Sequence, residues 1–359
     1  MKKYTPFRQA CQILFLITCL LIGYEFYQFV TPLEQGTLPR VSRPPGVEAF
    51  LPISALVSLK YFLVTGIINQ VHPSALVILC LALITALGVK KGFCSWVCPV
   101  GFLSELLWRL RPGQLKRVVI PGIADWGLRS LKYFILLFFL FTILWQMNSA
   151  ALGQFIHSAY HIVADIKMLR FFTHMSGTAA AVLAGLVVLS FIFPYFWCRY
   201  LCPYGALAGL ISFLSPVKVR RNASSCTDCG RCNRACPSRI RISRAAVVRS
   251  DECFGCGRCA EACPEPDTLA LSLPVRSGKV PGAAVAGFVL IVFLGGSLLA
   301  RTAGIWHNQV PDRVYLAAML ETDLIEPDRI KNMDELIQNL DRRGKRILMM
   351  KMMNPPEKQ

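Results

Sequence analysis

Two short runs of the chain each contain four cysteines at the same spacing. The runs read CTDCGRCNRACP (226–237) and CFGCGRCAEACP (253–264), so the pattern Cys-x2-Cys-x2-Cys-x3-Cys-Pro occurs twice. This spacing is typical of bacterial domains that hold two [4Fe–4S] clusters, in which the fourth cysteine of each run binds the other cluster. The pattern therefore predicts two ligand sets, Cys226, Cys229, Cys232 and Cys263 for one cluster, and Cys253, Cys256, Cys259 and Cys236 for the other.

Zinc is the alternative ligand of these cysteines, because zinc sites also use paired Cys-x2-Cys sequences. Structural zinc sites usually take two pairs set apart in the chain. Three cysteines within seven residues and a fourth from a distant run suit the corners of a cubane better, so we predict iron–sulfur clusters. Gly230, Gly255 and Gly257 are expected to let the backbone approach each cluster and donate amides to sulfur.

A second cysteine motif is also repeated. The phrases FCSWVCPVG (93–101) and WCRYLCPYG (197–205) each place two cysteines four residues apart, with proline after the second. Proline suits the first position of a helix, so Cys98 and Cys202 should lie where helix amides favour a thiolate. If the two hairpins pack side by side, Cys94, Cys98, Cys198 and Cys202 converge at the membrane boundary.

Four converging thiols would hold a further iron–sulfur centre or form a dithiol relay. The alternative is four separate buried thiols, which are common singly. The cysteines outside all these motifs, Cys11, Cys19 and Cys80, are expected to be plain apolar packing.

The composition indicates a membrane protein. Of the 359 residues, 54% are hydrophobic and 17% are charged, a lower charged fraction than soluble domains show. The net charge of +18 could suggest nucleic acid, but in a multipass protein it is better explained by lysine and arginine in cytoplasmic loops. No nucleic acid partner is therefore predicted, and membrane lipid is.

Five apolar segments are long enough to approach the thickness of a bilayer. They are residues 11–30, 71–89, 131–147, 177–196 and 283–300. Residues 50–69 are apolar but broken by Pro52, Lys60 and Gly66. If this segment crossed, the basic loops at 90–132 and after 196 would both lie outside, against the positive-inside rule. We therefore expect it to be a re-entrant or interfacial element.

These segments predict a mainly α, multipass membrane helical bundle of about five spans and one re-entrant element, with a small α+β two-cluster ferredoxin-like domain. The expected parts are a membrane domain with both CxxxCP hairpins (1–216), a cytoplasmic ferredoxin-like domain (217–273), a final transmembrane helix (281–300) and an extracytoplasmic tail (301–359). The N-terminus should be cytoplasmic, at a bacterial inner membrane. In the tail we expect a short helix and a frayed, methionine-rich end.

This combination of motifs resembles the NapH/NosR-type membrane polyferredoxin family, and the span after the ferredoxin-like domain resembles its YccM-like electron transport proteins. The stretches RPPGVEAFLPISALVSLKYFLVTG (43–66) and WCRYLCPYGAL (197–207) strengthen the resemblance, which covers roughly residues 40–310. It implies electron transfer between a quinone pool or cytoplasmic donor and a periplasmic reductase partner, or support of that partner's maturation. The flavin domain of NosR-like members has no counterpart here, so no flavin is predicted.

The five histidines, His72, His157, His161, His174 and His307, all fall on the expected outer face. His157 and His161 should share one side of a helix, where they could bind metal or take protons from a quinol, or they are simple surface residues. The chain lacks a Cys-x-x-Cys-His sequence, so no haem attachment is predicted.

The sequence thus predicts a membrane-bound iron–sulfur electron-transfer protein. The competing hypothesis is a redox-sensing or metalloenzyme maturation factor that uses the same clusters. We find no nucleophile–base pair or phosphate loop, so catalysis by side chains is not expected. Any enzymatic role would be that of a quinol dehydrogenase subunit.

Overall fold

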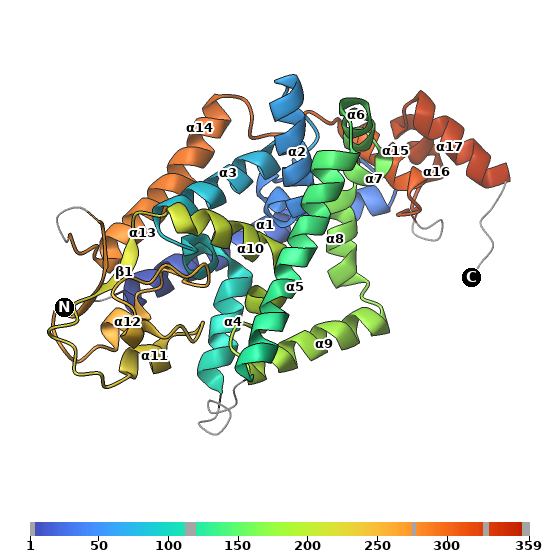
Figure 1. Cartoon of the computed structure of the whole chain (residues 1–359). Coiled ribbons are helices and arrows are strands. Elements are labelled where there is room, and N and C mark those ends of the chain that lie inside the picture. Colours follow the sequence, from blue (N-terminus) through green and yellow to red (C-terminus); the bar gives the residue numbers. More distant parts are fainter. Residues whose placement is uncertain (1–3, 112–119, 275–277, 326–329, 354–359) are drawn as a thin grey trace. The chain divides into compact units, whose positions relative to one another are not determined.

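The computed structural model describes residues 4–111, 120–274, 278–325 and 330–353, and these are mostly helical (Figure 1). The chain forms two compact units. Unit 1 comprises Met1–Thr18, Cys80–Phe141 and Gly177–Leu298, and unit 2 comprises Cys19–Leu79, Thr142–Ser176 and Leu299–Gln359. All cysteines of the four motifs belong to unit 1.

The elements follow one another along the chain as helices with two short strands near the cysteine runs. The longer helices are α1 (Thr5–Glu34), α2 (Pro52–Thr65), α3 (Pro73–Gly88), α4 (Pro99–Leu110), α5 (Gly122–Phe141), α6 (Ser149–Ile156), α8 (Ala164–Thr173), α9 (Gly177–Ile192), α10 (Pro203–Ile211), α13 (Gly282–Leu290), α15 (Asp312–Glu321) and α17 (Arg342–Met353). The shorter helices are α7 (Ala159–Ile162), α11 (Arg231–Ala235), α12 (Arg258–Glu261), α14 (Gly296–Thr302) and α16 (Met333–Asn339). The remaining elements are the turns η1 (Pro45–Phe50), η2 (Phe93–Val97), η4 (Thr142–Gln146), η5 (Trp197–Leu201), η6 (Ser212–Leu214), η7 (Ile242–Arg244) and η8 (Ile291–Gly295), with the strands β1 (Lys218–Arg221) and β2 (Leu269–Ser272).

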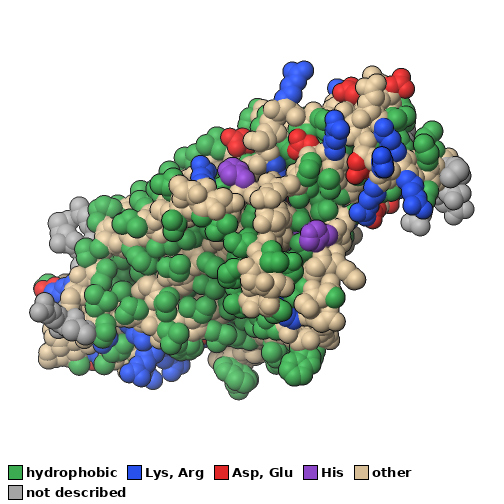
Figure 2. Space-filling model, turned by 90° about the horizontal axis from the view of Figure 1, so that it is seen from above, with side chains coloured by type: hydrophobic (Ala, Val, Ile, Leu, Met, Phe, Trp, Pro, Cys, Tyr) green, Lys and Arg blue, Asp and Glu red, His purple; other side chains and the backbone are tan. Residues whose placement is uncertain are grey.

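Within the described residues, three helical segments are long and apolar enough to cross a membrane. They are Thr5–Glu34, Gly122–Gln146 and Gly282–Thr302, and α8 with α9 adds a fourth if this broken pair is counted as one span. Hydrophobic side chains accordingly cover much of the surface visible in Figure 2. The predicted class of helical membrane protein agrees with these segments.

The five predicted spans correspond only in part to these segments. The expected spans 71–89 and 177–196 correspond to α3 and α9, which have 16 residues each, short of the roughly 20 that a straight crossing needs. The segment 50–69 contains α2, a helix of 14 residues that ends where Gly66 adopts a left-handed conformation with φ of 71°. The lengths of α2, α3 and α9 leave the exact span count a prediction.

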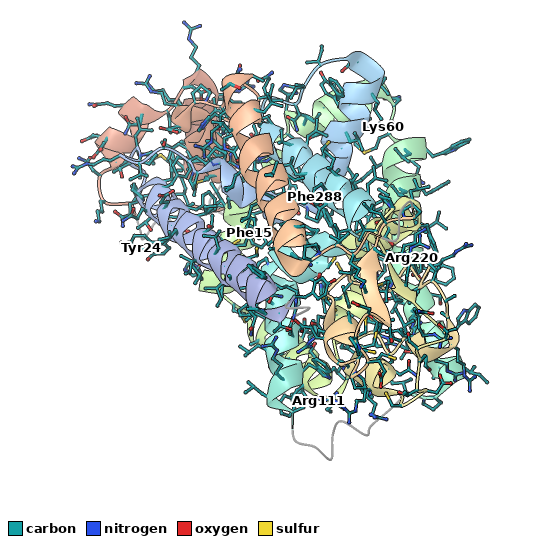
Figure 3. All side chains as sticks on the ribbon, turned by 90° about the vertical axis from the view of Figure 1, so that its left-hand side faces the viewer. Phe15, Tyr24, Lys60, Arg111, Arg220 and Phe288 are labelled. Carbon is teal, nitrogen blue, oxygen red and sulfur yellow. The ribbon has the colours of Figure 1, made fainter. Side chains whose placement is uncertain are left out.

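The first part of α1 and helix α13 lie side by side in unit 1 (Figure 3). The ring of Phe15 on α1 meets that of Phe293 edge-to-face, with 5.4 Å between centroids. Phe288 fits against Gly88, where an added Cβ would lie only 2.4 Å from its ring. Aromatic packing of this kind holds helices together where the apolar lipid supplies little driving force.

In the sequence, the two cysteine runs lie between the two strands of a small antiparallel sheet. Strand β1 pairs with β2, with Lys218 opposite Ser272 and Arg221 opposite Leu269. Glu261 of this segment accepts hydrogen bonds from the backbone amides of Tyr4 and Thr5, so it caps the otherwise unpaired amides at the start of α1. The beginning of α1 and the cysteine-rich segment therefore lie on the same side of any membrane that α1 crosses.

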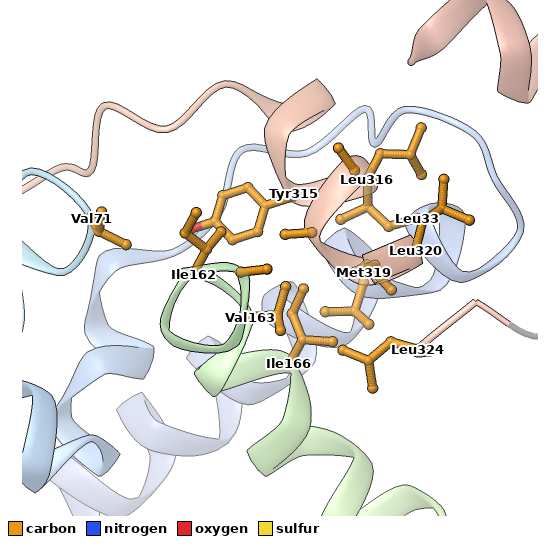
Figure 4. Close-up of a cluster of buried hydrophobic side chains, with 14 of the residues drawn as sticks. Leu33, Val71, Ile162, Val163, Ile166, Tyr315, Leu316, Met319, Leu320 and Leu324 are labelled. Carbon is orange, nitrogen blue, oxygen red and sulfur yellow. The ribbon is translucent and has the colours of Figure 1, made fainter. Parts of the chain in front are cut away.

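Unit 2 has a hydrophobic core to which α1, α7, α8 and the helices of the C-terminal segment contribute (Figure 4). Tyr315, Leu316 and Met319 of α15 are fully buried there, packed with Leu33 of α1 and Val163. The expectation of one short helix and a frayed tail is wrong for the described residues, because α15, α16 and α17 are all formed. Residues 354–359, the end of the predicted methionine-rich tail, lie outside the described residues.

In unit 2, a network of buried ion pairs forms around Arg43, the first residue of the 43–66 stretch. The Arg43 guanidinium donates to Glu48 at 2.7 Å and to Asp165 at 2.6 Å, and none of the three side chains is more than 3% exposed. Burial alone would raise the pKa of Glu48, but Arg43 and His72 lower it to about 2. Buried charges are retained only when paired in this way.

Two histidines join the network. The His72 Nε2 donates to the His161 carbonyl oxygen at 2.8 Å, and the His161 Nε2 lies 3.0 Å from the Ser54 hydroxyl. The prediction that His157 and His161 share one side of a helix is wrong, because α6 ends before His157 and Ser158 caps the separate helix α7. The exposed histidines are His157, His174 and His307.

The buried His161 should make unit 2 sensitive to mild acid. Burial lowers the pKa of His161 to about 3, whereas an unfolded histidine binds a proton near pH 6.5. Below pH 6.5 the unfolded state therefore binds the extra proton, and stability should fall by up to about 1.4 kcal/mol per pH unit. We expect thermal unfolding of the detergent-solubilised protein, followed by tryptophan fluorescence, to lose this slope in His161→Asn.

The matched control is Ser54→Ala, which removes the same hydrogen bond without removing a titrating group. This variant should be about 1 kcal/mol less stable at all pH values and keep the wild-type slope. An unchanged slope in His161→Asn would contradict the assignment of the neutral, buried imidazole.

Candidate metal centre

Two cavities of similar size lie in the cysteine-rich segment, each with an empty volume of about 350 Å³ that includes open solvent. The first is lined by three cysteines of the first run and one of the second, Cys226, Cys229, Cys232 and Cys263. The second is lined by the complementary set, Cys253, Cys256, Cys259 and Cys236. The fold thus brings the fourth cysteine of each run to the other run's cavity.

The two cavities differ in exposure, and we call them the outer and the inner cavity. Cys229 of the outer cavity is exposed, while Cys253 and Cys259 of the inner cavity are 7% and 6% exposed. Burial raises the pKa of the inner-cavity thiol of Cys236 to about 12. A free thiol there would stay neutral, so binding iron requires that its proton be displaced.

The donor set fits iron–sulfur clusters better than zinc. Among the residues that the structure describes, no group of three or more His, Cys, Asp or Glu side chains is arranged to hold a single metal ion. The cysteines instead surround a cavity, as ligands of a multi-iron cluster do, and thiolate is the ligand that such clusters require.

The two runs share an unusual backbone geometry. Gly230 and Gly257 each precede a short helix, α11 or α12, and have φ of 68° and 71°. Two positions earlier, Asp228 and Gly255 also have positive φ, 49° and 61°. Position 255 requires glycine, because a Cβ on Gly255 would lie 2.8 Å from the carbonyl oxygen of Val89. The side chain of Asp228 is exposed, so position 228 has no such requirement.

The CxxxCP repeats also share one local structure. Each forms a π-helical turn, η2 or η5, that ends at the second cysteine, and the following helix begins at proline. The amide of Cys98 donates to the Phe93 carbonyl at 2.9 Å, and that of Cys202 donates to the Trp197 carbonyl at 3.0 Å. Such wide turns are uncommon and occur frequently at functional sites.

Glycine three residues after each Cys98 or Cys202 lets the new helix pass close to the preceding turn. A Cβ on Gly101 would lie 2.0 Å from the Cys94 carbonyl oxygen, and a Cβ on Gly205 would lie 3.3 Å from the Cys198 carbonyl oxygen. The Gly205 amide also donates to the Cys202 sulfur at 3.3 Å. The backbone therefore both positions the thiols and offers a donor to one of them.

The four thiols of the repeats come together in unit 1, and we call them the quartet (Cys94, Cys98, Cys198 and Cys202). Cys94 and Cys198 belong to one buried cluster with Tyr195 and Phe254. Burial raises the pKa of Cys198 well above its ordinary value, and the other three thiols of the quartet are close enough to raise it further. The two repeats therefore bring their four thiols into one another's electrostatic range.

The inner cavity is docked directly on the first repeat. The Lys91 amide donates to the Cys253 carbonyl at 3.2 Å, and the Ser95 hydroxyl donates to the Phe254 carbonyl at 2.6 Å. The loop 253–257, which supplies two of the cysteines that line the inner cavity, is thus held by hydrogen bonds against the turn that carries Cys94. Tyr4 covers the other side, where a Cβ on Gly257 would collide with its ring at 2.2 Å.

Aromatic rings fill the space between the inner cavity and the quartet. The rings of Phe254 and Tyr195 lie 5.0 Å apart, and both contact the cluster that contains Cys94 and Cys198. Cys256 of the inner cavity packs against the same cluster. Tyr195 has a left-handed backbone conformation with φ of 56°, a strained state for a bulky residue and one found mainly at functional sites.

A buried carboxylate fixes Tyr195 and the neighbouring elements. Glu105, 1% exposed, accepts hydrogen bonds from the Tyr195 hydroxyl at 3.2 Å and from Arg8, and Arg258 lies 3.6 Å away. Burial would raise the pKa of Glu105, but Arg8 and the other arginines lower it to about 2. The ionised carboxylate joins α1, α4 and the inner-cavity loop.

Two fully buried lysines lie beside the quartet. Lys91 and Lys132 both pair with the Glu252 carboxylate, Lys91 at 3.4 Å. Their positive charges act on the thiol of Cys94 and oppose the effect of burial, which raises its pKa. Gly209 leaves room for this arrangement, because an added Cβ would lie 2.8 Å from the Lys91 side chain.

The cysteines outside the motifs behave differently from one another. Cys11 is 4% exposed and packs in the core of unit 1, as predicted. Cys19 is half-buried on α1, and Cys80 is exposed on the apolar helix α3.

Fold and site together define a membrane-type helical protein with a ferredoxin-type iron–sulfur domain. Residues 71–117 and 176–222 each match the 4Fe-4S binding domain family, and residues 218–264 match the 4Fe-4S dicluster domain family. The repeated match coincides with the two CxxxCP hairpins. No solved structure shows significant similarity to the chain.

The chain is 40% identical to "Putative electron transport protein YccM" of Escherichia coli over 90% of this chain and 92% of the relative. The chain therefore belongs to the YccM family of electron transport proteins. It is also 27% identical to "Methylamine utilization ferredoxin-type protein MauN" of Methylorubrum extorquens over 52% of this chain and 61% of that protein. "Ferredoxin-type protein NapH" of Escherichia coli is 28% identical over 42% of this chain and 49% of its own length.

Sequence reasoning missed the polar residues that join these parts. Glu105, Glu252 and Lys132 were not expected at the site, since lone charged residues in a membrane protein carry no spacing pattern. Lys132 offered one signal, because a charge at the edge of an apolar segment needs a buried partner.

The space available for a Cβ differs between Gly101 and Gly205, so alanine variants at these two positions form a matched pair. Gly101→Ala forces a Cβ against a backbone oxygen at 2.0 Å and should destabilise unit 1 by about 3 kcal/mol or more, whereas Gly205→Ala should cost about 1 kcal/mol. The measurement is thermal unfolding of both purified variants beside wild type. Equal losses in the two variants would contradict the closer approach in the first repeat.

Proposed function

We propose that this protein passes electrons between a soluble carrier and a membrane quinone through two [4Fe–4S] clusters and a third iron–sulfur centre. Cys226, Cys229, Cys232 and Cys263 would hold the outer cluster, Cys253, Cys256, Cys259 and Cys236 the inner one, and the quartet the third centre. The observation that carries the proposal is the docking of loop 253–257 on the turn of Cys94. Iron–sulfur centres supply one-electron transfer when bound.

The order of the sites follows from their burial. The exposed Cys229 puts the outer cavity within reach of a soluble partner, while buried Cys253 and Cys259 keep water from the inner one. Five arginines of this segment are exposed and would attract an acidic carrier, namely Arg231, Arg234, Arg241, Arg244 and Arg249. The segment 217–273 would therefore act as the entry domain.

The surroundings of the quartet favour an iron–sulfur centre over a dithiol relay. A centre ligated by four thiolates carries net negative charge, and Lys91 and Lys132 are buried next to Cys94. Buried lysines are stabilised by such a counter-charge. Four sulfurs contributed symmetrically by two repeats also match a four-ligand site.

The partner on the membrane side would be a quinone, which takes two electrons and two protons to become a quinol, or releases them in the reverse direction. The quartet follows the ends of the apolar helices α3 and α9, so it lies where a quinone head group can approach. With the N-terminus cytoplasmic, as the basic start of the chain predicts, the entry domain would face the cytoplasm of a bacterial inner membrane.

The test is reoxidation of the reduced protein by a soluble quinone analogue. Dithionite-reduced, desalted protein should recover its iron–sulfur absorbance within a stopped-flow experiment, and Cys198→Ser should recover at least about tenfold more slowly because one ligand of the third centre is lost. Cys80→Ser, a change at an exposed cysteine outside every motif, should match wild type.

Intact clusters that the quinone analogue cannot reoxidise in wild type would contradict the proposal. That result would favour the alternative function, a redox-sensing or maturation factor that uses the same clusters without transferring electrons to a quinone.

A further inference from the structure

Unit 1 contains a third cavity, separate from the two cysteine-lined ones, with an empty volume of about 1070 Å³ that includes open solvent. It is lined by residues from the start of α5, the end of α9, the turn η5 and the loop after Cys236. Ser238 and Ile240 line both this cavity and the inner one, so the two share a wall. The proposed electron path does not use this space.

The lining of the cavity is strongly basic. Four arginines, Arg129, Arg199, Arg239 and Arg241, face a single carboxylate, Asp125, which leaves an excess of three positive charges. Asp125 is already engaged, because it accepts two hydrogen bonds from Arg199 at 2.8 and 2.9 Å, one from Tyr200 at 2.6 Å, and pairs with Arg129 at 2.5 Å.

The arginines differ in exposure. Arg199 is 4% exposed and is held by Asp125, whereas Arg241 is exposed. The excess of three positive charges favours an anionic ligand in this cavity. Arginine is also the side chain best shaped to bind phosphate oxygens.

The position of the cavity indicates which kind of molecule would supply a phosphate group. Gly122 is the first residue of the apolar segment Gly122–Gln146, and Phe193 directly follows the apolar helix α9, and both line the cavity. The cavity thus lies where two apolar helices end, at the level expected for lipid head groups. Basic pockets at the ends of membrane helices commonly bind anionic lipids.

We propose that this cavity binds the phosphate of an anionic phospholipid head group. Arg239 and Arg241, on the loop that follows Cys236, would contact it together with Arg199. The lipid would then bridge the cysteine-rich segment to α5 and α9. Its negative charge would lie beside the wall that this cavity shares with the inner cavity.

Native mass spectrometry of the detergent-purified full chain, titrated with phosphatidylglycerol or phosphatidylcholine, tests the proposal. Wild type should retain phosphatidylglycerol in preference to phosphatidylcholine. The double variant Arg239→Gln/Arg241→Gln should bind phosphatidylglycerol about tenfold more weakly, with phosphatidylcholine unchanged. If the double variant fails to fold, Arg241→Gln alone, at an exposed side chain, should shift affinity in the same direction.

The matched control is Arg244→Gln/Arg249→Gln, which removes two exposed charges from the same segment but outside the cavity lining. The control should keep wild-type affinity. Equal loss in both double variants would overturn the site in favour of general surface charge. Glycerol phosphate that binds as tightly as phosphatidylglycerol would overturn the lipid as source and indicate a soluble phosphate ester.

Discussion

The contact between loop 253–257 and the turn that carries Cys94 is the constraint on which the rest of the site depends. It joins a soluble-type, cysteine-rich segment to the membrane-type helices by one backbone hydrogen bond from Lys91 and one side-chain hydrogen bond from Ser95. Such bonds leave little freedom to rotate one part against the other. The inner cavity and the quartet are therefore held close together, as the proposed electron transfer between them would require.

Several features that look unrelated in the sequence serve this contact. Gly255 has no side chain because the Val89 carbonyl occupies that space, and Gly257 makes room for Tyr4. Glu105 is buried at 1% exposure and ties α1, α4 and the strained Tyr195 together. Buried charges on this scale are expensive in an apolar protein. Because these charges are paired, we infer that they make the surroundings of the cysteines rigid.

The sequence predicted the local grouping of the cysteines well, because the spacing within each motif involves neighbouring residues. It indicated which cysteines could share a cavity and that Cys98 and Cys202 precede new helices. It could not show the long-range partners, since Glu252 with Lys132 or Arg43 with Asp165 are separated by over a hundred positions and have no periodic pattern. The helix predicted around His157 and His161 failed because Ser158 caps a new helix, a local choice that hydrophobic periodicity does not record.

Iron content of the anaerobically purified protein tests the central claim most directly, namely that sulfurs of the entry domain and of the two membrane repeats all bind iron. The account predicts about twelve irons and twelve acid-labile sulfides per chain in wild type if the third centre is also a cubane, and about eight in Cys198→Ser. Iron-free protein, or a wild type that holds no more iron than Cys198→Ser, would contradict it.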